Sequence, residues 1–432
     1  MDESKIEEET GSAVDAGEGE GHWHPVRKLL FRFSCIYFLW YALPDFAFPG
    51  RSNDFVVAMY RIAIWVGENI LKLGDELSFD PAPTSGDTTV HYVKLLVMVV
   101  ASLAGSLVWT LFDRRRPHYR RLGGWLVVVC RYYLMSVMLT YGFNKVFLGQ
   151  FHPLSLDRLL ETYGASSPMG LLWTTMEYSR PYTLFSGLAE VIGGLLMGLR
   201  RTTTLGACIV AGVMSNVVMM NFSYDVPVKL YSSHLLLMAL VLLALDSRRL
   251  LDVLVLNRPA RAAVYSPHFV GRRGRIATLA VKALTIGLFL VMNVSTGLAS
   301  QKFYGSDASK PPLWGIYDVE TFVMDEEILP PLLTDARRWQ NLIFDTRGRL
   351  SVRMMDGTIE RYGFAVDGAN KLSIYRDRRY SWTYERPSPE RLLLAGELGG
   401  RAVSLELRAR DLDDFLLVRR GFHWVNEVPL IR

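Results

Sequence analysis

The sequence predicts a mainly α-helical membrane protein, a polytopic bundle of about seven spans, followed by an all-β extracytoplasmic domain. Three observations carry this prediction. Between residues 29 and 296, apolar residues gather into runs of about twenty with one charge or none, the length that crosses a hydrocarbon core. The loops on one side of these runs are basic, and those on the other side are not. After residue 310, the runs give way to short alternating segments.

Composition narrows the class of protein only slightly. The 432 residues are 50% hydrophobic and 21% charged, with a net charge of +5. Cys35, Cys130 and Cys208 all lie in apolar runs, so we expect neither a disulfide framework nor a CxxC redox pair. No HExxH, Walker, GxGxxG or nucleophile-elbow sequence stands in a suitable place, so we expect no metal site and no hydrolase, kinase or dehydrogenase reaction.

Residues 1–26 are acidic, rich in glycine and almost free of large apolar side chains. This composition predicts a disordered cytoplasmic lead. The apolar run that follows Arg27 and Lys28 is too long for a secretory signal and lacks a cleavage site. We therefore expect the first run to be an uncleaved membrane helix, which begins a transmembrane domain over residues 27–298.

Seven apolar runs are candidate spans, and they cover residues 29–48, 93–112, 125–148, 182–199, 203–222, 230–245 and 276–296. An eighth run, 55–71, carries Arg61 and Glu68 on one face, which favours a helix lying at the membrane interface. With seven spans, the basic segments 112–121, 199–202 and 248–275 all fall on the side of Arg27 and Lys28. The positive-inside rule then places the amino terminus in the cytoplasm of an inner-membrane protein and the carboxyl-terminal domain outside.

Two charged residues lie deep within the predicted membrane segments. Arg131 and Glu190 lie at matching depths in the runs 125–148 and 182–199, so we expect them to pair across neighbouring helices. Gly187 and Gly194 flank Glu190 and would let a neighbouring helix approach closely. Two interpretations stay open: a buried ion pair that only fixes packing, and a functional polar site.

Further polar residues gather at the predicted outer end of the helices. Met135, Met138, Gly142 and Lys145 continue from Arg131 along one helix face. Each residue taken singly suits a helix end or a hydrogen-bonded core. Their shared depth instead predicts a pocket that opens outward beneath the amphipathic segment 149–182. Its candidate residues are Tyr141, Asn144, Lys145, Asn221, Tyr224, Asp225, Lys229 and His234.

The patterns RYYLMSVMLTYGFNK (131–145) and GLAEVIGGLLMGLRRTTTLGA (187–207) resemble the DoxX/DoxD-like membrane proteins. The resemblance covers about residues 123–245, and Arg131, Gly142, Lys145, Glu190, Gly193 and Gly194 match its pattern. It implies a four-helix unit. Some relatives act with quinones, so it also implies a quinone as cofactor and a redox partner protein. The first two spans, the loop with SGDTT (85–89) and the long tail depart from the family unit.

The tail, 299–432, predicts about eight short strands in a small antiparallel barrel or sandwich. Leu350, Val352 and Met354 alternate with polar residues, and similar segments follow at 371–375, 379–385, 391–396, 401–407 and 414–420. Residues 314–322, with Tyr317, and Arg419 or Arg420 resemble the Gly-x-Trp motif and closing arginine of lipocalins. The domain is either a ligand cup or a plain surface for protein contacts.

Two functions follow from these patterns. In the first, the chain is a membrane component of a redox system whose outward pocket holds a quinone. In the second, it is a non-catalytic scaffold or assembly protein whose β-domain binds a periplasmic partner. Apart from the quinone, no cofactor is implied. Because the arginines lie beside anionic lipid headgroups, membrane lipids are expected partners and nucleic acid is not.

Overall fold

A computed structural model describes residues 22–47, 54–74, 77–78, 85–260, 271–305, 308–368 and 370–431. The first 21 residues of the expected acidic lead lie outside the described residues. The chain divides into two compact units. A helical unit comprises Met1–Phe143 with Phe185–Asn293, and a β-barrel unit comprises Asn144–Leu184 with Val294–Arg432. Each unit is described by itself.

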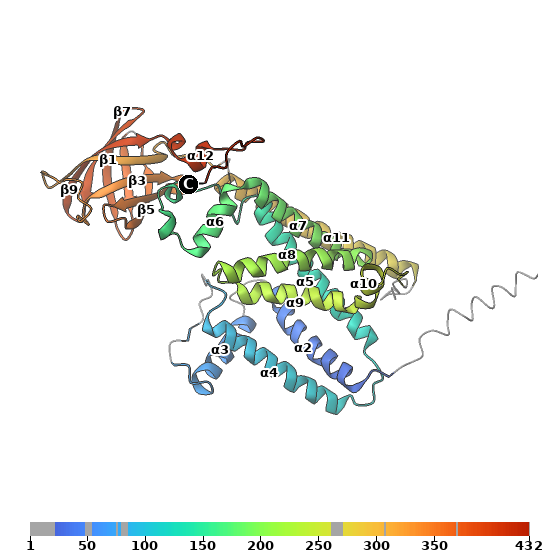
Figure 1. Cartoon of the computed structure of the whole chain (residues 1–432). Helices are drawn as coiled ribbons and strands as arrows, with labels where there is room; N and C mark the ends of the chain where they lie inside the picture. Colours follow the sequence, from blue (N-terminus) through green and yellow to red (C-terminus); the bar gives the residue numbers. More distant parts are fainter. Residues whose placement is uncertain are drawn as a thin grey trace, which may run out of the picture. The chain divides into compact units, whose positions relative to one another are not determined.

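Helices form at all seven expected spans. Within the described residues, the helices of the first unit, some of which continue into the second, are α2 (Pro25–Ala47), α3 (Asp54–Asn69), α4 (Thr89–Phe112), α5 (Arg120–Val146), α7 (Arg180–Gly198), η3 (Arg200–Thr202), α8 (Thr203–Ser223), α9 (Lys229–Leu245), α10 (Ser247–Leu254) and α11 (Arg272–Tyr304). Figure 1 shows this order from blue to yellow.

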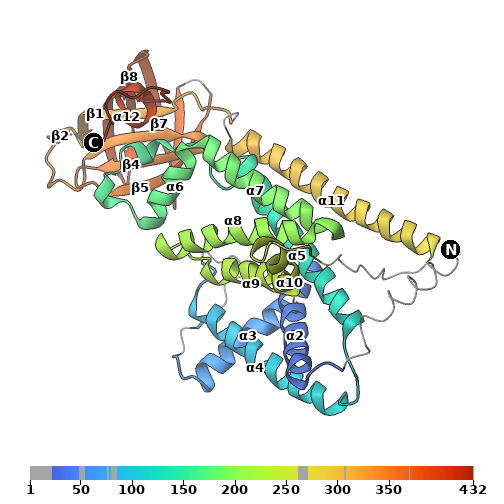
Figure 2. The same cartoon turned by 45° about the vertical axis from the view of Figure 1, so that its right-hand side comes forward.

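In the described part of the chain, four helices are long and apolar enough to cross a membrane: α4, α5, α11 and α8 with η3. A fifth crossing results if α9 and α10, bent by 74° at their junction, count as one span. Helices α2 and α7 are less apolar because Arg32 and Glu190 interrupt them. Helix α3, with 16 residues, is shorter than the roughly 20 needed to span. Its Tyr60 and Ala63 pack against Val90 and Val93 of α4. Figure 2 shows the two helices side by side.

Glycines set the contacts of α7 with its neighbours. A Cβ at Gly142 of α5 would lie 2.8 Å from the carbonyl oxygen of Gly187, and one at Gly194 would lie 3.0 Å from Met138. A side chain at either position would push the helices apart. The stripe of Met135, Met138 and Gly142 therefore faces α7, where the sequence also places Glu190.

The second unit contains a closed antiparallel barrel. Eight strands pair in chain order, and the last returns to the first: β1 (Gly315–Met324), β3 (Trp339–Asp345), β4 (Arg349–Met354), β5 (Ile359–Val366), β6 (Lys371–Tyr375), β7 (Arg379–Ser388), β8 (Arg391–Leu398) and β9 (Arg401–Arg410). The short β2 (Glu327–Ile328) forms a hairpin with β1. The prediction of a helical membrane protein with a β-domain is confirmed, and closure of the sheet decides for a barrel over a sandwich (Figure 1).

Alternating side chains fill the barrel interior. Phe322, Leu342, Phe344 and Leu350 are fully buried there, and the Trp339 and Trp382 rings stack at 5.9 Å. Tyr317 occupies the place of the lipocalin tryptophan and is 1% exposed. The interior is therefore a packed core over these strands.

The prediction of a last strand over residues 414–420 is wrong. The chain instead forms η5 (Leu412–Asp414) and α12 (Leu416–Arg419). The pairing of β9 with β1 closes the sheet, so no edge remains at this seam to receive another strand. Arg419 and Arg420 consequently follow the barrel and do not close it. Burial raises the pKa of Tyr317, and the charge of Arg386 on β7 opposes this shift.

The amphipathic segment 149–182 forms η1 (Leu156–Leu159), η2 (Tyr163–Ala165) and α6 (Pro168–Tyr178). Its Leu156 and Leu160 pack against Ile316 and Ile343 on the outside of the barrel. Arg353 also donates a 2.8 Å hydrogen bond to the carbonyl of Leu160. The contacts thus group residues 144–184 with the β-domain, whereas the sequence places them in the transmembrane domain.

Candidate functional site

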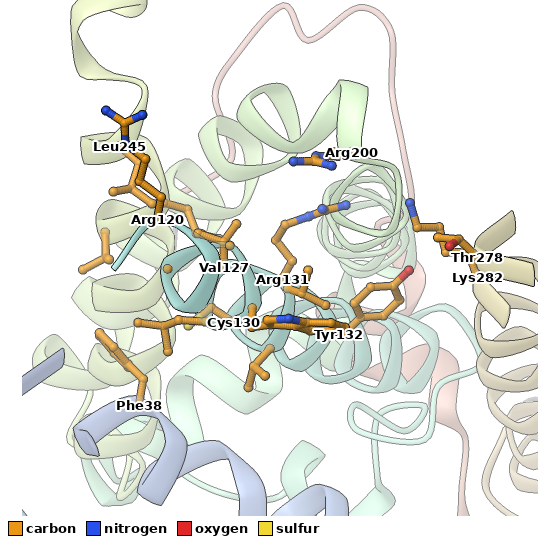
Figure 3. A pocket seen from close by; sticks show the side chains of 18 of the residues that line it. Phe38, Arg120, Val127, Cys130, Arg131, Tyr132, Arg200, Leu245, Thr278 and Lys282 are labelled. Carbon is orange, nitrogen blue, oxygen red and sulfur yellow. The ribbon is translucent and has the colours of Figure 1, made fainter. Parts of the chain in front are cut away.

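A large groove opens in the helical unit between α2, α5, α9 and α11 (Figure 3). Its volume is about 1410 Å³. Most of its wall is apolar, and Phe38, Val127, Leu245 and Phe289 represent the four helices. Pockets for small molecules usually measure about 300–1,000 Å³, so this groove has room for a longer ligand.

The polar part of the groove is strongly basic. Among its described lining residues none is acidic, and six are basic: Arg27, Arg120, Arg131, Arg200, Arg275 and Lys282. Four of these come from the beginnings of α2, α5 and α11 and from the turn after α7. The sequence predicts that these segments share one side of the membrane, and here they meet at one groove. That this side is the cytoplasm stays a prediction.

Arg131 lies inside the helical unit, with 3% of its surface exposed. Its Nε and Nη2 donate to the carbonyl of Met197 at 3.0 and 2.8 Å. Met197 is the penultimate residue of α7, so its carbonyl has no partner further along that helix. Arg131 therefore stabilises the carboxyl-terminal end of α7.

Lys282 and Arg200 complete a cluster with Arg131. Lys282 on α11 is close enough to Arg131 and Arg200 for both charges to act on it. Figure 3 shows Lys282 facing the other two from the opposite wall. Beside them, the hydroxyl of Tyr132 is buried without a hydrogen-bond partner in the structure. The groove thus combines clustered positive charge with an unsatisfied hydroxyl.

The pairing of Arg131 with Glu190 stays a prediction. Glu190 is buried in α7, with 2% exposed, about two helical turns before Met197. The structure adds the Met197 carbonyl as a partner of Arg131. No sequence pattern indicates that contact, because it depends on where α7 ends against α5.

Three residues of the expected outward pocket, Asn221, His234 and Tyr141, make contacts within the helical unit. The Asn221 side chain donates to Ser232 Oγ at 2.9 Å. The ring of His234 bonds the Leu230 carbonyl through Nδ1 and the Tyr37 hydroxyl through Nε2. Both ring nitrogens of His234 are thus engaged, as in a satisfied core histidine. Tyr141, on α5, lies 6.1 Å from the ring of Tyr231.

The remaining expected pocket residues lie at helix ends. Lys229 and Asp225 form a 2.8 Å ion pair, and Tyr224 is the C-cap of α8. Asp87, in the SGDTT segment, accepts from the backbone N–H groups of Lys229 and Leu230 and so caps α9. Asn144 and Lys145, the latter buried, belong to the β-barrel unit. An outward pocket that combines all eight residues stays a prediction.

Arg32 is a buried residue that the sequence analysis did not single out. Its guanidinium donates to the Tyr119 hydroxyl, Thr110 Oγ1 and the Asp113 carbonyl, at 2.6–2.9 Å. Tyr119 in turn donates to the carboxylate of Asp113 and lowers its pKa. This network joins α2 to the loop between α4 and α5. The sequence signal for Arg32 was its charge inside the first apolar run. Lys282, inside the last run, gave the same kind of signal.

The chain is similar in part to a bacterial protein. The uncharacterized protein YwoB of Bacillus subtilis (strain 168) is 32% identical over 123 residues, which are 28% of this chain and 78% of the Bacillus protein. No family model matches the chain. No solved structure matches it either.

Proposed function

The chain belongs to the same family as the Bacillus subtilis protein YwoB, and we propose that its helical unit binds one long-chain amphiphile of the membrane in the groove. The observation that carries this proposal is the groove itself, which is about 1410 Å³ in volume and apolar over most of its wall. Its basic residues offer a place for a head group, and its apolar wall offers a place for a chain.

The resemblance to DoxX/DoxD-like proteins suggests one class of amphiphile, an isoprenoid quinone. A quinone carbonyl would accept a hydrogen bond from the Tyr132 hydroxyl, which has no partner in the structure. In this form of the proposal, the protein is the membrane component of a redox system, and a partner enzyme supplies the electrons.

Extraction of the gently purified full-length protein tests the proposal. We expect about one amphiphile per chain to co-purify with the wild type. Thr278→Trp fills the groove from α11 and should abolish co-purification. Ala280→Trp adds the same ring to an exposed position of α11 that does not line the groove, and it should retain the ligand. Equal retention by both variants, or no ligand in the wild type, would refute the proposal.

A second function, the scaffold, is favoured by the barrel surface. Outward-facing residues of β1, β7, β8 and β9, among them Thr383 and Glu406, line a concavity of about 490 Å³. A photo-crosslinker at Thr383 should give one discrete protein adduct in cells, whereas one at the exposed Arg376 should give none. Identical patterns from the two positions would remove this alternative.

A further inference from the structure

We propose that residues 421–431, the segment after the barrel, lie on the surface of the membrane and insert their apolar side chains among the lipid head groups. The partner is a lipid surface, and the effect is an additional attachment of the barrel unit to the membrane. This inference does not depend on the groove of the helical unit.

The exposure of large apolar side chains is the first argument. Every residue from 421 to 431 is exposed. Trp424 is 91% exposed, and its ring contacts that of Phe422 with the centroids 5.0 Å apart. The other large apolar side chains of the segment are those of Val425, Val428, Leu430 and Ile431. Six such side chains within ten residues are more than the scattered exposure that is normal on a soluble surface, and they mark an interaction site.

The place where the segment leaves the barrel is the second argument. Phe415 packs with Leu156 and Ile316 in one apolar cluster. His152, which precedes Leu156 in the same amphipathic segment, stacks on the ring of Tyr304 at a centroid distance of 5.0 Å. Tyr304 is the last residue of α11, which is long and apolar enough to cross a membrane, and tyrosines at such ends lie at the head-group level. These residues all belong to the barrel unit, so the segment starts close to the end of a membrane helix.

The strand register gives the same result. Arg410, at the end of β9, pairs with Ile316 near the start of β1, the first strand after Tyr304. The chain therefore enters and leaves the barrel at the same end. Because β1 has ten residues, the opposite end lies roughly 30 Å away. The chain from Phe415 to Trp424 can span at most about 30 Å, so Trp424 can reach the lipid surface around Tyr304.

The residue types suit the membrane interface and not the hydrocarbon core. Tryptophan and other aromatic rings are favoured at the head-group level. The segment is too short to span a bilayer, and its irregular backbone, which contains Pro429, would leave polar groups unpaired in hydrocarbon. The Arg420 side chain donates a hydrogen bond to Asn426 and so closes the turn that carries Phe422 and Trp424. The segment therefore lies on the membrane and does not cross it.

Collisions of a spin label with oxygen, which concentrates in lipid, and with a nickel chelate, which stays in water, test the proposal. The full-length protein carries Cys208→Ala, since Cys208 is the exposed native cysteine, and is placed in dioleoylphosphatidylcholine nanodiscs. The label is attached at Val425→Cys or, as the matched control, at Leu333→Cys. Both native side chains are 71% exposed, but Leu333 lies between β2 and β3, at the opposite end of the strands. We expect the ratio of oxygen to nickel collisions at Val425 to be at least about threefold the ratio at Leu333.

A second pair of variants tests whether the aromatic side chains hold the segment in the lipid. Phe422→Ser with Trp424→Ser should lower the collision ratio of the label at Val425, because two of its apolar anchors are removed. Ile328→Ser with Leu332→Ser removes two exposed apolar side chains at the opposite end of the barrel and should leave that ratio unchanged. Since all four native side chains are exposed, the barrel should stay folded, and calorimetry of the full-length protein checks this.

Three results would overturn the proposal. The first is an equal collision ratio at Val425 and Leu333. The second is an unchanged ratio at Val425 after the Phe422 and Trp424 substitutions. The third is an immobilised label at Val425 with low collision rates for both reagents, which would show that the segment packs against a protein surface and not against lipid.

Discussion

The helical unit and the β-barrel distribute apolar side chains in opposite ways. On α11, Leu279 and Leu284 are 69% and 72% exposed, and no residue of its most apolar stretch is buried. In the barrel, Leu342 and Phe344 are fully buried, while the outer surface carries arginines and carboxylates. The exposure of large apolar side chains along α11 would be costly in water. The contrast indicates that lipid surrounds the helices and that water surrounds the barrel.

Each unit, however, contains a buried arginine that donates to backbone carbonyls. Arg131 donates to the carbonyl at the end of α7, and Arg338 of the barrel donates to the carbonyls of Val319, Leu329 and Trp339. Backbone carbonyls thus serve as acceptors for a buried guanidinium group in each unit. A buried charge can therefore be structural in either unit.

The first prediction tests the two environments directly. Ser404 on β9 and Ser247 at the start of α10 are both exposed, and we expect them on opposite sides of the membrane. With Cys208 replaced by Ala, Ser404→Cys should react with an impermeant thiol reagent on intact cells. Ser247→Cys should react only after permeabilisation. Labelling of both in intact cells would contradict the predicted topology.

The second prediction compares one chemical change in the two units. Leu342→Ala leaves a cavity in the packed barrel and should lower the free energy of unfolding of that unit by about 2–5 kcal/mol. Leu284→Ala removes the same atoms from an exposed face of α11 and should change stability by less than about 0.5 kcal/mol. Calorimetry of the full-length protein in nanodiscs measures both. Equal losses would mean that the face of α11 is packed and not lipid-exposed.

The third prediction asks whether the buried charges of the helical unit compensate one another. Arg131→Met removes the hydrogen bonds to Met197 and should cost about 2 kcal/mol or more. If Glu190 is its partner, Arg131→Met with Glu190→Gln should recover at least about 1 kcal/mol. If the losses of stability measured by thermal unfolding are purely additive, Arg131 acts only at the end of α7.

The sequence predicts the helices well because spanning a membrane is a local requirement. The length and hydropathy of a run decide it, so α4, α5, α8 and α11 were foreseeable. The groove was not foreseeable from the sequence, because it depends on which helix faces pack against one another. Lys282 is separated by 151 positions from Arg131, and its proximity follows only from packing.

The barrel also shows that local sequence predicts individual elements better than the way they pack together. Alternation predicts strands such as β4, β6 and β9, which pair with neighbours in the chain. The segment 414–420 has comparable apolar content but forms η5 and α12, because the pairing of β9 with β1 already closes the sheet. The sequence likewise suggests His234 as a pocket residue. In the fold, its two ring nitrogens bond the Tyr37 hydroxyl and the Leu230 carbonyl.

The last and smallest expected effect concerns pH and the barrel unit. Burial raises the pKa of Glu177 on α6 to about 7, with Arg158 and Arg349 opposing the shift and Asp157 and Asp345 adding to it. Its Oε2 has no hydrogen-bond partner in the structure. Between the ordinary value of 4.5 and about 7, the folded state therefore binds more protons than the unfolded state. Stability of this unit should fall as pH rises through that window and change little from this cause above it.

Glu177→Gln keeps the shape of the side chain and removes its titration, so the decline between pH 4.5 and 7 should become shallower. Glu397→Gln, on the exposed outer surface of β8, should leave the wild-type slope in place. Calorimetry of the barrel unit within the full-length protein, at intervals across this window, measures the difference. An unchanged slope in Glu177→Gln would show that the charged carboxylate is solvated in the folded protein. The surroundings of Glu177 on α6 would then be open to water.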